Sequence, residues 1–522
     1  MSRSRARPVA PARLPRHPPV GPPDGSGVDF VLAAAAVVAA CVVFRGTLGY
    51  FFAQDDFTGL ARARGLAPPV GFPWRWLSGQ LYFDVMRAVA GLEPMAYRAA
   101  SLAAHAACVA LVYRWCRRFA APPAAALGAV FFGTHPALYT ALYSVSGIGE
   151  ILAAGCGLGA LLLATRADRA AWLALPLFAA SLLSKESTLL LPLVALLPAL
   201  RTPRDATPAG RSAVAWAMVA LSLAYLGAFL VRDVFGVRAR LDAAAPYALR
   251  FDRTLVDNLL TYLGWSVRIA LPSVRSFSDA VDPGVFADGA VFAVVVLGGL
   301  ALRDLRARGW GVGAALFAAT LLPVLPLVHH TYHYYLYAPL AGVAVLVAAL
   351  ASAAMARLAR IAGRALPVAL LAATALVLAV NGALLVHRIE TYPFVDPELR
   401  SDPTVDRARI AANAIADLRA AGLPRGTRLW FWSPVSLARQ REAGGNPAVE
   451  SYWESNVRGA LYDGLAARVF LPQVDSTRFV RRFEPAADRV RYAVYLPNGH
   501  LKVGAPAQLD SLLRAAAARA TP

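Results

Sequence analysis

Two adjacent carboxylates, Asp55 and Asp56, follow a long apolar stretch and are the first residues in the sequence that could do chemistry. Ionisable side chains at a membrane edge are expensive, so they are candidates for function. One carboxylate could act as a general base while its neighbour holds a substrate or a metal ion. In the structural alternative, Asp55 caps a short helix that begins at Asp56. Position alone leaves these two interpretations equal.

Lysine is rare in this chain, because Lys185 and Lys502 are the only lysines among 52 basic residues. Lys185 and Glu186 stand between two short apolar stretches, where we expect a tight turn at one membrane face. An ammonium group at this place could neutralise a lipid phosphate. The alternative is an internal ion pair of Lys185 with Glu186 or another carboxylate, which would stabilise the turn.

Histidine and glutamate mark two further segments. His135 is predicted at the end of an apolar stretch, where a lone histidine is more often a cap than a ligand, and Glu150 enters the next stretch. Residues 329–339 read His-His-Thr-Tyr-His-Tyr-Tyr-Leu-Tyr-Ala-Pro. No cysteine or carboxylate set accompanies these histidines, so zinc is not favoured. Such aromatic density is typical of a membrane interface, and it also suits a sugar-binding rim.

The composition predicts that membrane helices position these residues. The chain of 522 residues is 58% hydrophobic and 16% charged, against roughly 45–50% and about 25% in soluble proteins. A disordered chain, a coiled coil and an ordinary soluble enzyme are therefore excluded. A membrane span needs about 20 apolar residues, and by that length we predict eleven spans: 29–49, 96–114, 121–138, 148–165, 170–184, 186–201, 211–231, 285–303, 310–328, 335–355 and 366–387.

The arginines predict the orientation. The net charge of +20 comes largely from clusters in alternate connections, as expected of cytoplasmic loops. The N-terminus is then inside, the C-terminus is outside, and nucleic acid is not an expected partner. All the candidate segments face the extracytoplasmic side, so we expect one site at that membrane rim. The clusters are the N-terminal tail, Arg114/Arg117/Arg118, Arg166/Arg169, Arg201/Arg204/Arg211, Arg303/Arg306/Arg308 and Arg357/Arg360/Arg364.

Three domains follow from these patterns. We predict a disordered cytoplasmic tail at 1–28, a transmembrane domain at 29–387 with outer loops 50–95 and 232–284, and a soluble α/β domain at 388–522. Within the loops, 74–89 is expected to be an interfacial amphipathic helix, and 254–272 an interfacial or re-entrant helix. The soluble domain should contain a helix at 405–421, a strand at 427–432, and a hairpin of 491–496 and 500–503 around Asn498-Gly499. The four cysteines indicate neither zinc nor a disulfide framework.

In order, these segments resemble the GT-C membrane glycosyltransferases, over roughly residues 30–390. The branch they resemble is the protein O-mannosyltransferase-like one, which includes the transmembrane and tetratricopeptide-repeat O-mannosyltransferases. The matching segments are Asp55-Asp56-Phe57, the stretch from His135-Pro136 to Glu150-Ile151-Leu152, Leu182-Leu183-Ser184-Lys185-Glu186, and Tyr335-Leu336-Tyr337-Ala338-Pro339. The chain departs from the pattern at Tyr334 and Ile148, where the family has basic residues, and it lacks the tetratricopeptide repeats.

The resemblance implies a multi-pass inner-membrane enzyme that transfers a sugar from a polyprenyl-phosphate donor to a hydroxyl acceptor with inversion. By matching position, Asp55 is the expected base and Asp56 orients the sugar or Asp55. Lys185 is the expected phosphate ligand, and a divalent metal is permitted but not required. The wider expected substrate-binding set is His135, Glu150, Glu186, His333, Tyr335 and Tyr337, with Arg268 or Arg275 in place of the missing family arginine.

Two other classes of function compete with this reading. A flippase or transporter of lipid-linked sugars predicts charges in the middle of several spans and symmetry between two halves of the chain. A non-catalytic membrane scaffold that presents residues 388–522 predicts indifference to the loss of Asp55 and Lys185. The sequence indicates neither the sugar, beyond a mannose-like hexose or a pentose, nor whether the acceptor is protein, glycan or lipid.

Overall fold

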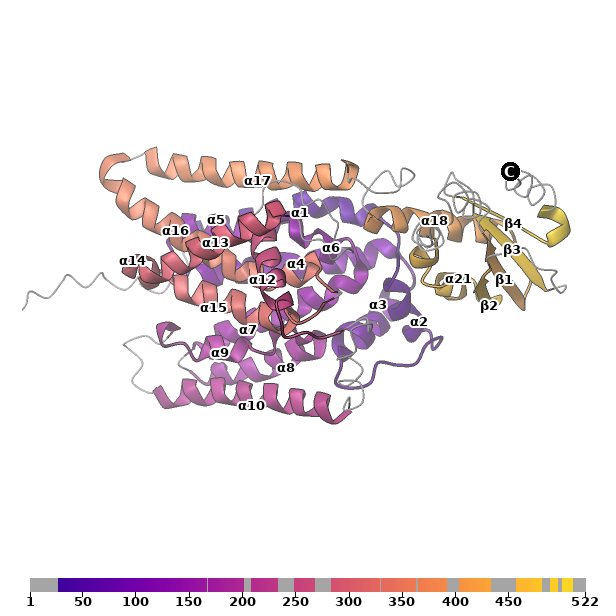
Figure 1. Cartoon of the computed structure of the whole chain (residues 1–522), viewed down its shortest axis with the longest axis horizontal. Coiled ribbons are helices and arrows are strands. Elements are labelled where there is room, and N and C mark those ends of the chain that lie inside the picture. The colour runs from indigo at the N-terminus through magenta and orange to yellow at the C-terminus, as the bar shows by residue number, and fades with distance from the viewer. Residues whose placement is uncertain are drawn as a thin grey trace, which may run out of the picture.

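The computed structural model describes residues 27–166, 168–200, 208–232, 248–267, 283–328, 330–362, 365–391, 403–432, 457–480, 489–495 and 500–509. These residues form an elongated bundle of helices with a small sheet at one end (Figure 1). The described part of the chain is mostly helical, as predicted. The predicted tail at 1–28 lies almost entirely outside it.

The bundle is built from helices of very different length. Its first half contains α1 (Gly27–Phe44), α2 (Asp56–Ala63), α3 (Tyr82–Ala90), α4 (Pro94–Cys116), α5 (Pro122–Thr134), α6 (Tyr139–Leu142), α7 (Ile148–Ala164), α8 (Ala174–Ser184) and α9 (Leu191–Ala195). Its second half contains α10 (Pro208–Arg232), α12 (Thr254–Trp265), α13 (Pro283–Ala301), α14 (Arg303–Ala307), α15 (Trp310–Leu321), α16 (Pro339–Ala362) and α17 (Ala365–Thr391).

Each of the eleven predicted apolar stretches contains helix, but not every one is long enough to cross a bilayer. Among the described residues, seven helices are long and apolar enough, and α5 with 136–142, bent by 41°, would make an eighth. The remaining stretches form shorter apolar helices, Arg169–Ser184, Glu186–Ala195 and Trp310–Val324. At 1.5 Å per residue, a helix of 12 residues such as α15 covers about 18 Å of the roughly 30 Å hydrocarbon layer. The chain is thus a multi-pass membrane protein, and the eleven crossings remain a prediction.

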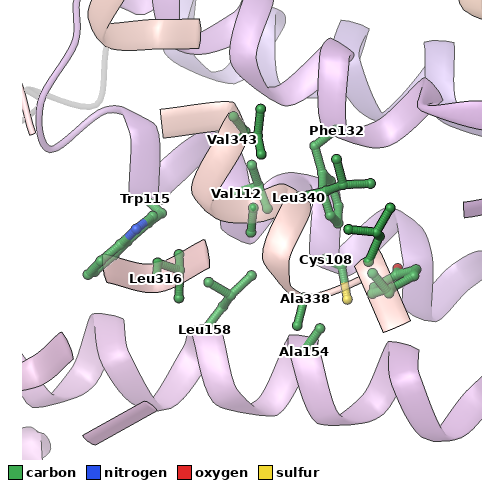
Figure 2. Packing of buried hydrophobic residues seen from close by; sticks show 14 of the residues in the cluster. Cys108, Val112, Trp115, Phe132, Ala154, Leu158, Leu316, Ala338, Leu340 and Val343 are labelled. Atoms are coloured by element: carbon green, nitrogen blue, oxygen red, sulfur yellow. The ribbon is translucent and has the colours of Figure 1, made fainter. Parts of the chain in front are cut away.

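Small residues let the central helices approach closely. A Cβ at Gly128 of α5 would lie 2.5 Å from the Ala344 carbonyl oxygen of α16, and one at Gly342 would lie 2.5 Å from the Gly313 carbonyl oxygen of α15. Close backbone contact of this kind drives helix association in membranes. Figure 2 shows side chains of α4, α7, α15 and α16 meeting in this core: Cys108, Val112, Trp115, Ala154, Leu158, Leu316, Leu340 and Val343.

Helices are also found in the two predicted outer segments. A short π-helical turn at Leu77–Leu81 continues into α3, which confirms a helix in 74–89. The segment predicted at 254–272 is helical over α12, which packs against α13. Residues 268–282 lie outside the described residues, and with them Arg268 and Arg275. Whether α12 enters and leaves on one side therefore stays a prediction.

A four-stranded mixed sheet follows the bundle, with β1 (Thr427–Trp432), β2 (Val474–Phe479), β3 (Val490–Tyr495) and β4 (Leu501–Gly504) in the order β2-β1-β3-β4. β1 pairs in parallel with β2 and β3, and β3 pairs antiparallel with β4. The predicted helix 405–421 corresponds to α18 (Pro403–Ala420), and the predicted strands to β1, β3 and β4. Asn498-Gly499 lies outside the described residues. Nothing in the sequence analysis predicted β2 or α21 (Leu465–Phe470).

The segments after residue 403, called here the C-terminal unit, pack directly on the first outer loop. Phe52 and Phe57 lie in one apolar cluster with Leu461 and Phe470, and the ring centroids of Phe52 and Phe470 are 6.1 Å apart. The Arg64 guanidinium donates a hydrogen bond to the Val469 carbonyl oxygen. The C-terminal unit and the loop that carries Asp55 therefore share a core. The predicted domain limits at 28 and 388 remain predictions.

Candidate functional site

A cavity of about 510 Å³ lies where the helical bundle meets the C-terminal unit. Its lining comes from four sequence regions that are far apart: 54–83, 140–150, 184–185 and 332–335, together with Thr404, Arg407 and Tyr462. In Figure 1, α2 and α3 lie at the same end of the bundle as the sheet, whereas α14 lies at the opposite end. Five predicted site residues line this cavity: Asp55, Glu150, Lys185, His333 and Tyr335.

Asp55 presents its carboxylate to the cavity instead of capping a helix. It occupies the position before α2, but its side chain makes no capping hydrogen bond, and it is exposed to the cavity. Loss of bulk water and the neighbouring Asp56 charge raise its pKa above the ordinary aspartate value, while Arg75, Lys185 and Arg407 oppose the rise. A carboxylate with a raised pKa, open to a cavity, is suited to accept a proton.

Asp56 is turned away from the cavity that Asp55 lines. It is 1% exposed, it is not among the cavity-lining residues, and both of its carboxylate oxygens are engaged. One accepts from the Ser146 backbone N–H at 2.7 Å and from the Ser144 hydroxyl at 3.1 Å, and the other accepts from the Ala53 N–H at 3.1 Å. Asp56 therefore joins the loop at 53–56 to the loop at 144–146. These contacts fit the expectation that Asp56 orients Asp55 better than direct contact of Asp56 with a sugar, and its catalytic role stays a prediction.

A buried arginine joins the same two loops. Arg98 of α4 is 1% exposed, and it donates to the Tyr50 carbonyl oxygen at 2.6 Å and the Tyr143 carbonyl oxygen at 2.9 Å. It also donates to the carbonyl oxygen of Phe51. Arg98 and Asp56 thus satisfy backbone groups of these irregular loops, which holds the loops together. The sequence analysis missed Arg98, since it lies within a predicted span.

Lys185 is paired, but not with its neighbour in sequence. Its ammonium lies 2.5 Å from the Glu150 carboxylate oxygen, and the Ser187 hydroxyl donates to the other Glu150 oxygen at 3.4 Å. The same ammonium lies 4.6 Å and 4.9 Å from the ring centroids of Tyr334 and Tyr335, within cation–π range. The internal ion pair considered as an alternative is therefore present, and its partner is Glu150. Both residues nevertheless line the cavity.

Glu186 pairs with an arginine that the sequence analysis did not single out. The Arg75 guanidinium donates from Nε to a Glu186 oxygen at 3.1 Å and makes a second contact from Nη2 to the other oxygen. Arg75 lines the cavity, whereas Glu186 does not. Arg75 also adopts a left-handed backbone conformation, with φ of 42°. A non-glycine residue held in this region stores strain, which is often found at functional sites.

The aromatic segment forms one wall of the cavity. Tyr332, His333, Tyr334 and Tyr335 line it, and His333 stacks on Trp265 of α12 with ring centroids 3.9 Å apart and planes at 23°. Tyr332 and Tyr334 stack at 5.2 Å and 14°. Rings aligned in this way offer flat faces to a sugar or to the start of a lipid chain. The predicted aromatic rim thus lies beside Lys185.

Two predicted site residues lie elsewhere. His135 is 3% exposed and accepts a hydrogen bond from the Ala137 N–H at 3.2 Å, so it caps the turn after α5. Tyr337 is fully buried, and its hydroxyl lies 2.7 Å from Nδ1 of His105 on α4. Neither residue lines the cavity. Helix packing, which the sequence pattern does not resolve, turns both side chains into the bundle, and their assignment to a substrate pocket stays a prediction.

The structure adds residues from the C-terminal unit. Arg407 of α18 and Tyr462 line the cavity together with Gln54 and Arg62, and the Gln54 backbone N–H donates to the Ala460 carbonyl oxygen at 3.2 Å. Gln54 and Tyr462 have φ angles of 55° and 47°. Three of the four non-glycine residues with positive φ in the described chain therefore line this cavity. In the sequence, the only hint of these backbone conformations is that the three residues lie in segments expected to turn.

Within the described residues, no three His, Cys, Asp or Glu side chains are grouped so that they could hold a metal ion. Asp55 faces the cavity while Asp56 is turned away, so the adjacent carboxylates do not form a chelating pair. The described side chains that line this cavity therefore do not fit a metal site. The cavity instead combines the carboxylates of Asp55 and Glu150 with four basic side chains and an aromatic wall, which suits proton transfer beside an anionic group. The basic side chains are Arg62, Arg75, Lys185 and Arg407.

No protein-family model matches the chain, and no curated protein matches it. Two solved structures are similar to it. The arabinofuranosyltransferase AftD from Mycobacteria has 17% identity and a TM-score of 0.37, over 77% of this chain and 29% of AftD. ArnT from Cupriavidus metallidurans, bound to undecaprenyl phosphate, has 16% identity and a TM-score of 0.37, over 85% of this chain and 78% of ArnT. The chain thus spans less than a third of AftD, and similarity at this level carries no argument about activity.

Proposed function

We propose that this protein is a membrane glycosyltransferase that moves a sugar from a polyprenyl-phosphate donor to a hydroxyl acceptor with inversion. The observation that carries the proposal is the shared cavity of Asp55 and Lys185, which are 130 positions apart in the sequence. A carboxylate and an ammonium that open into the same space can serve the two ends of one displacement reaction. A non-catalytic scaffold does not need this pairing.

In the proposed reaction, the acceptor hydroxyl attacks the anomeric carbon of the donor and its proton passes to the Asp55 carboxylate. The new bond joins the acceptor oxygen to the anomeric carbon, and the bond from that carbon to the phosphate oxygen breaks. Both bonding electrons leave with the polyprenyl phosphate. Attack from the side opposite to the leaving group inverts the anomeric centre. A phosphate leaves without needing a proton, so the chemical demand falls on the base.

Charge grows on the phosphate as its bond breaks, and fixed cations stabilise that charge. Lys185 and Arg75 supply them at the cavity wall. Each already has a carboxylate partner, Glu150 or Glu186, and these partners hold the cations in place before the donor arrives. In this proposal Arg75 takes the place of the arginine that the related family has at position 334. Tyr335 and His333 receive the sugar and the first isoprene units.

The orientation in the membrane is part of the proposal. The arginine-bearing helix α14 lies at the end of the bundle opposite to the sheet and to α2 and α3 (Figure 1). Basic residues mark cytoplasmic loops, so the cavity end would face the extracytoplasmic side of the inner membrane. The sugar would be a mannose-like hexose or a pentose. Polyprenyl-phosphate sugars presented at that face are the matching class of donor.

The test is release of polyprenyl phosphate by the purified full-length protein in lipid vesicles. Polyprenyl-phosphate mannose and polyprenyl-phosphate arabinose are supplied separately, each with methyl glycosides and a serine- and threonine-rich peptide as acceptors. We expect one donor to be consumed with a stoichiometric glycosylated product. Asp304→Asn is the matched control, because Asp304 lies on α14, at the other end of the bundle, and pairs with Arg308 just after that helix. If neither donor is consumed but labelled donor crosses the bilayer, the transferase proposal is wrong and transport replaces it.

A further inference from the structure

The residue directly before the proposed base has an unusual backbone conformation. Gln54 has a φ angle of 55°, in the left-handed region that few residues other than glycine adopt. This conformation costs free energy, and it persists only where neighbouring contacts enforce it. A change of φ at Gln54 would rotate the peptide that leads into Asp55. The direction of the Asp55 carboxylate therefore depends on the contacts that hold Gln54.

Contacts with the C-terminal unit hold Gln54 through both its main chain and its side chain. The Gln54 backbone N–H donates to the Ala460 carbonyl oxygen at 3.2 Å. The side-chain amide is oriented with its oxygen towards Arg407 of α18, because this orientation satisfies both groups, and the Arg407 Nε donates to that oxygen at 3.1 Å. On the side of the bundle, the Gln54 carbonyl oxygen accepts from the Phe57 N–H at 3.1 Å. Gln54 thus connects the first turn of α2 to the C-terminal unit.

A packed aromatic core keeps these contacts in place. The ring centroid of Phe470 on α21 lies 6.1 Å from that of Phe52 and 6.3 Å from that of Phe57. Phe470 is 7% exposed, and the other two rings are fully buried. Ala460 belongs to the same cluster. Because a close-packed core opens only at a cost, the Ala460 carbonyl oxygen stays next to the Gln54 N–H.

Asp55 lies between two anchored neighbours. After it, Asp56 accepts hydrogen bonds from the Ser144 hydroxyl and the Ser146 backbone N–H. Before it, Gln54 is held by the C-terminal unit. The Asp55 side chain makes no capping hydrogen bond and is exposed to the cavity. The two anchors can therefore orient the Asp55 carboxylate and leave it open to a substrate.

We propose that Gln54 is a positioning residue, through which the C-terminal unit holds the Asp55 carboxylate in the direction that the transfer reaction needs. The C-terminal unit is then an integral part of the catalytic site. The inference rests on the proposed transferase function, since it takes Asp55 as the base. Gln54 lines the cavity, but in this proposal it acts through Asp55 and not on the substrate.

Two substitutions at position 54 separate the backbone conformation from the side chain. Gln54→Gly removes the amide and relieves the strain, because glycine adopts positive φ readily. Gln54→Ala removes the same amide and keeps the strain, so the loop should relax and turn Asp55 away. We expect kcat to fall by about 10- to 100-fold in Gln54→Ala and by no more than about threefold in Gln54→Gly. The KM for the donor should stay unchanged in both.

The donor in these assays is polyprenyl-phosphate mannose or polyprenyl-phosphate arabinose, whichever the full-length protein consumes in lipid vesicles. Equal losses in the two variants, or a larger loss in Gln54→Gly, would overturn the inference, because the amide itself would then contact the substrate. Turnover by Gln54→Ala at the wild-type rate would overturn it as well.

The role of the C-terminal unit is tested with Phe470→Leu. Hydrogen–deuterium exchange of residues 50–57, measured on the full-length protein, reports opening of the loop. We expect faster exchange in this segment and a kcat about three- to tenfold lower, because the smaller side chain loosens the shared core. Val494→Ala is the matched control, since Val494 of β3 is fully buried in a cluster that, within the described residues, contains only the C-terminal unit. It should change neither quantity.

The same measurements separate this inference from the proposed function. If the wild-type protein consumes no donor, yet Phe470→Leu and not Val494→Ala speeds exchange in residues 50–57, the transferase proposal fails and the hold of the C-terminal unit on the loop stands. Faster exchange with unchanged kcat in Phe470→Leu would overturn the inference alone. Equal effects of Phe470→Leu and Val494→Ala would also overturn it, because they would show a general loss of stability.

Discussion

Two clusters of ionic residues, one at each end of the bundle, show why buried charge is not by itself a sign of function. At one end, Arg117 of α4 donates to both carboxylate oxygens of Asp29, at 2.5 Å and 3.3 Å, and Tyr113 donates to the same carboxylate at 2.7 Å. Arg117 also donates to the Ala120 carbonyl oxygen at 2.6 Å. At the other end, Asp55, Glu150 and Lys185 line a cavity of about 510 Å³.

The difference lies in what surrounds the charges. The Asp29 cluster is closed, because the planar guanidinium of Arg117 donates to both carboxylate oxygens and the Tyr113 hydroxyl donates a further hydrogen bond to one of them. The cavity cluster is open, because the Lys185 ammonium and the Asp55 carboxylate both face a space large enough for a ligand. The closed cluster ties the start of α1 to the end of α4, whereas the open one can exchange partners with a substrate. Neutralising one charge in each cluster should therefore have opposite consequences.

Asp55→Asn should have the largest effect on activity. Removing a general base costs about 10²- to 10⁴-fold in rate, and we expect transfer to fall by at least about 10³-fold. Folding should not suffer: the raised pKa of Asp55 means that its contribution to stability is full at low pH and lost as pH rises through that pKa. The protein with an uncharged asparagine at position 55 should therefore be no less stable than the wild type at neutral pH. Product formation and thermal unfolding, measured on the same preparation, check both statements.

Asp29→Asn is the counterpart in the closed cluster. It should leave the rate within about twofold and lower the free energy of unfolding by about 3 kcal/mol, because Arg117 loses a charged partner in a buried pair. Near-normal turnover by Asp55→Asn would contradict its role as the base. A large loss of activity in Asp29→Asn without unfolding would contradict the contrast between the clusters.

Lys185→Ala should have the next largest effect, and it sharpens the comparison with a double variant. Loss of the ammonium should lower kcat/KM by about 10²-fold through weaker stabilisation of the leaving phosphate. It should also cost about 3–5 kcal/mol of stability, because Glu150 is left buried without its cation. Lys185→Ala with Glu150→Gln should recover the stability but not the activity. Recovery of both in the double variant would make the pair structural.

Much of this arrangement is predictable from sequence because it depends on local pattern. Apolar stretches predict helices, and all eleven predicted stretches contain helix. The identity of Asp55 and Lys185 as rim charges also follows from their positions after apolar stretches. The sequence pattern does not predict the direction in which a side chain points. Asp56 is adjacent to Asp55, yet its carboxylate faces two backbone N–H groups and the Ser144 hydroxyl.

Contacts across long stretches of sequence explain the remaining misses. Arg75 reaches Glu186 over 111 positions, and Arg407 enters the cavity from the C-terminal unit, which no local pattern connects to Asp55. His135 and Tyr337 have the residue types of a binding pocket, but packing buries them against Ala137 and His105. Tertiary packing determines which of these side chains line the cavity and which are buried, and a single sequence contains little information about that packing.

Asp56→Ala should have a moderate effect, because Asp56 positions the loops and does not touch substrate. Three hydrogen bonds to its carboxylate would be lost, and the donors left in a buried place would cost about 1–3 kcal/mol. We expect a drop of about tenfold in kcat with little change in the KM for donor. Asp56→Asn should recover part of it, since an amide oxygen can still accept from the Ser146 N–H. A variant as inactive as Asp55→Asn would mean that Asp56 takes a direct part in catalysis.

The smallest effect expected is a displacement of the pH profile, and it tests whether Arg407 of the C-terminal unit acts on Asp55 across the cavity that both residues line. Transfer should decline as pH falls and the Asp55 carboxylate is protonated, with an acidic limb set by a pKa that burial and Asp56 raise. Arg407 lowers that pKa, so Arg407→Gln should move the limb to higher pH. Arg409→Gln, outside the cavity, should leave it in place. The measurement is kcat/KM with a neutral acceptor between pH 4 and pH 8, so that the acceptor itself does not titrate. A limb that moves to lower pH in Arg407→Gln would mean that the guanidinium does not face the base.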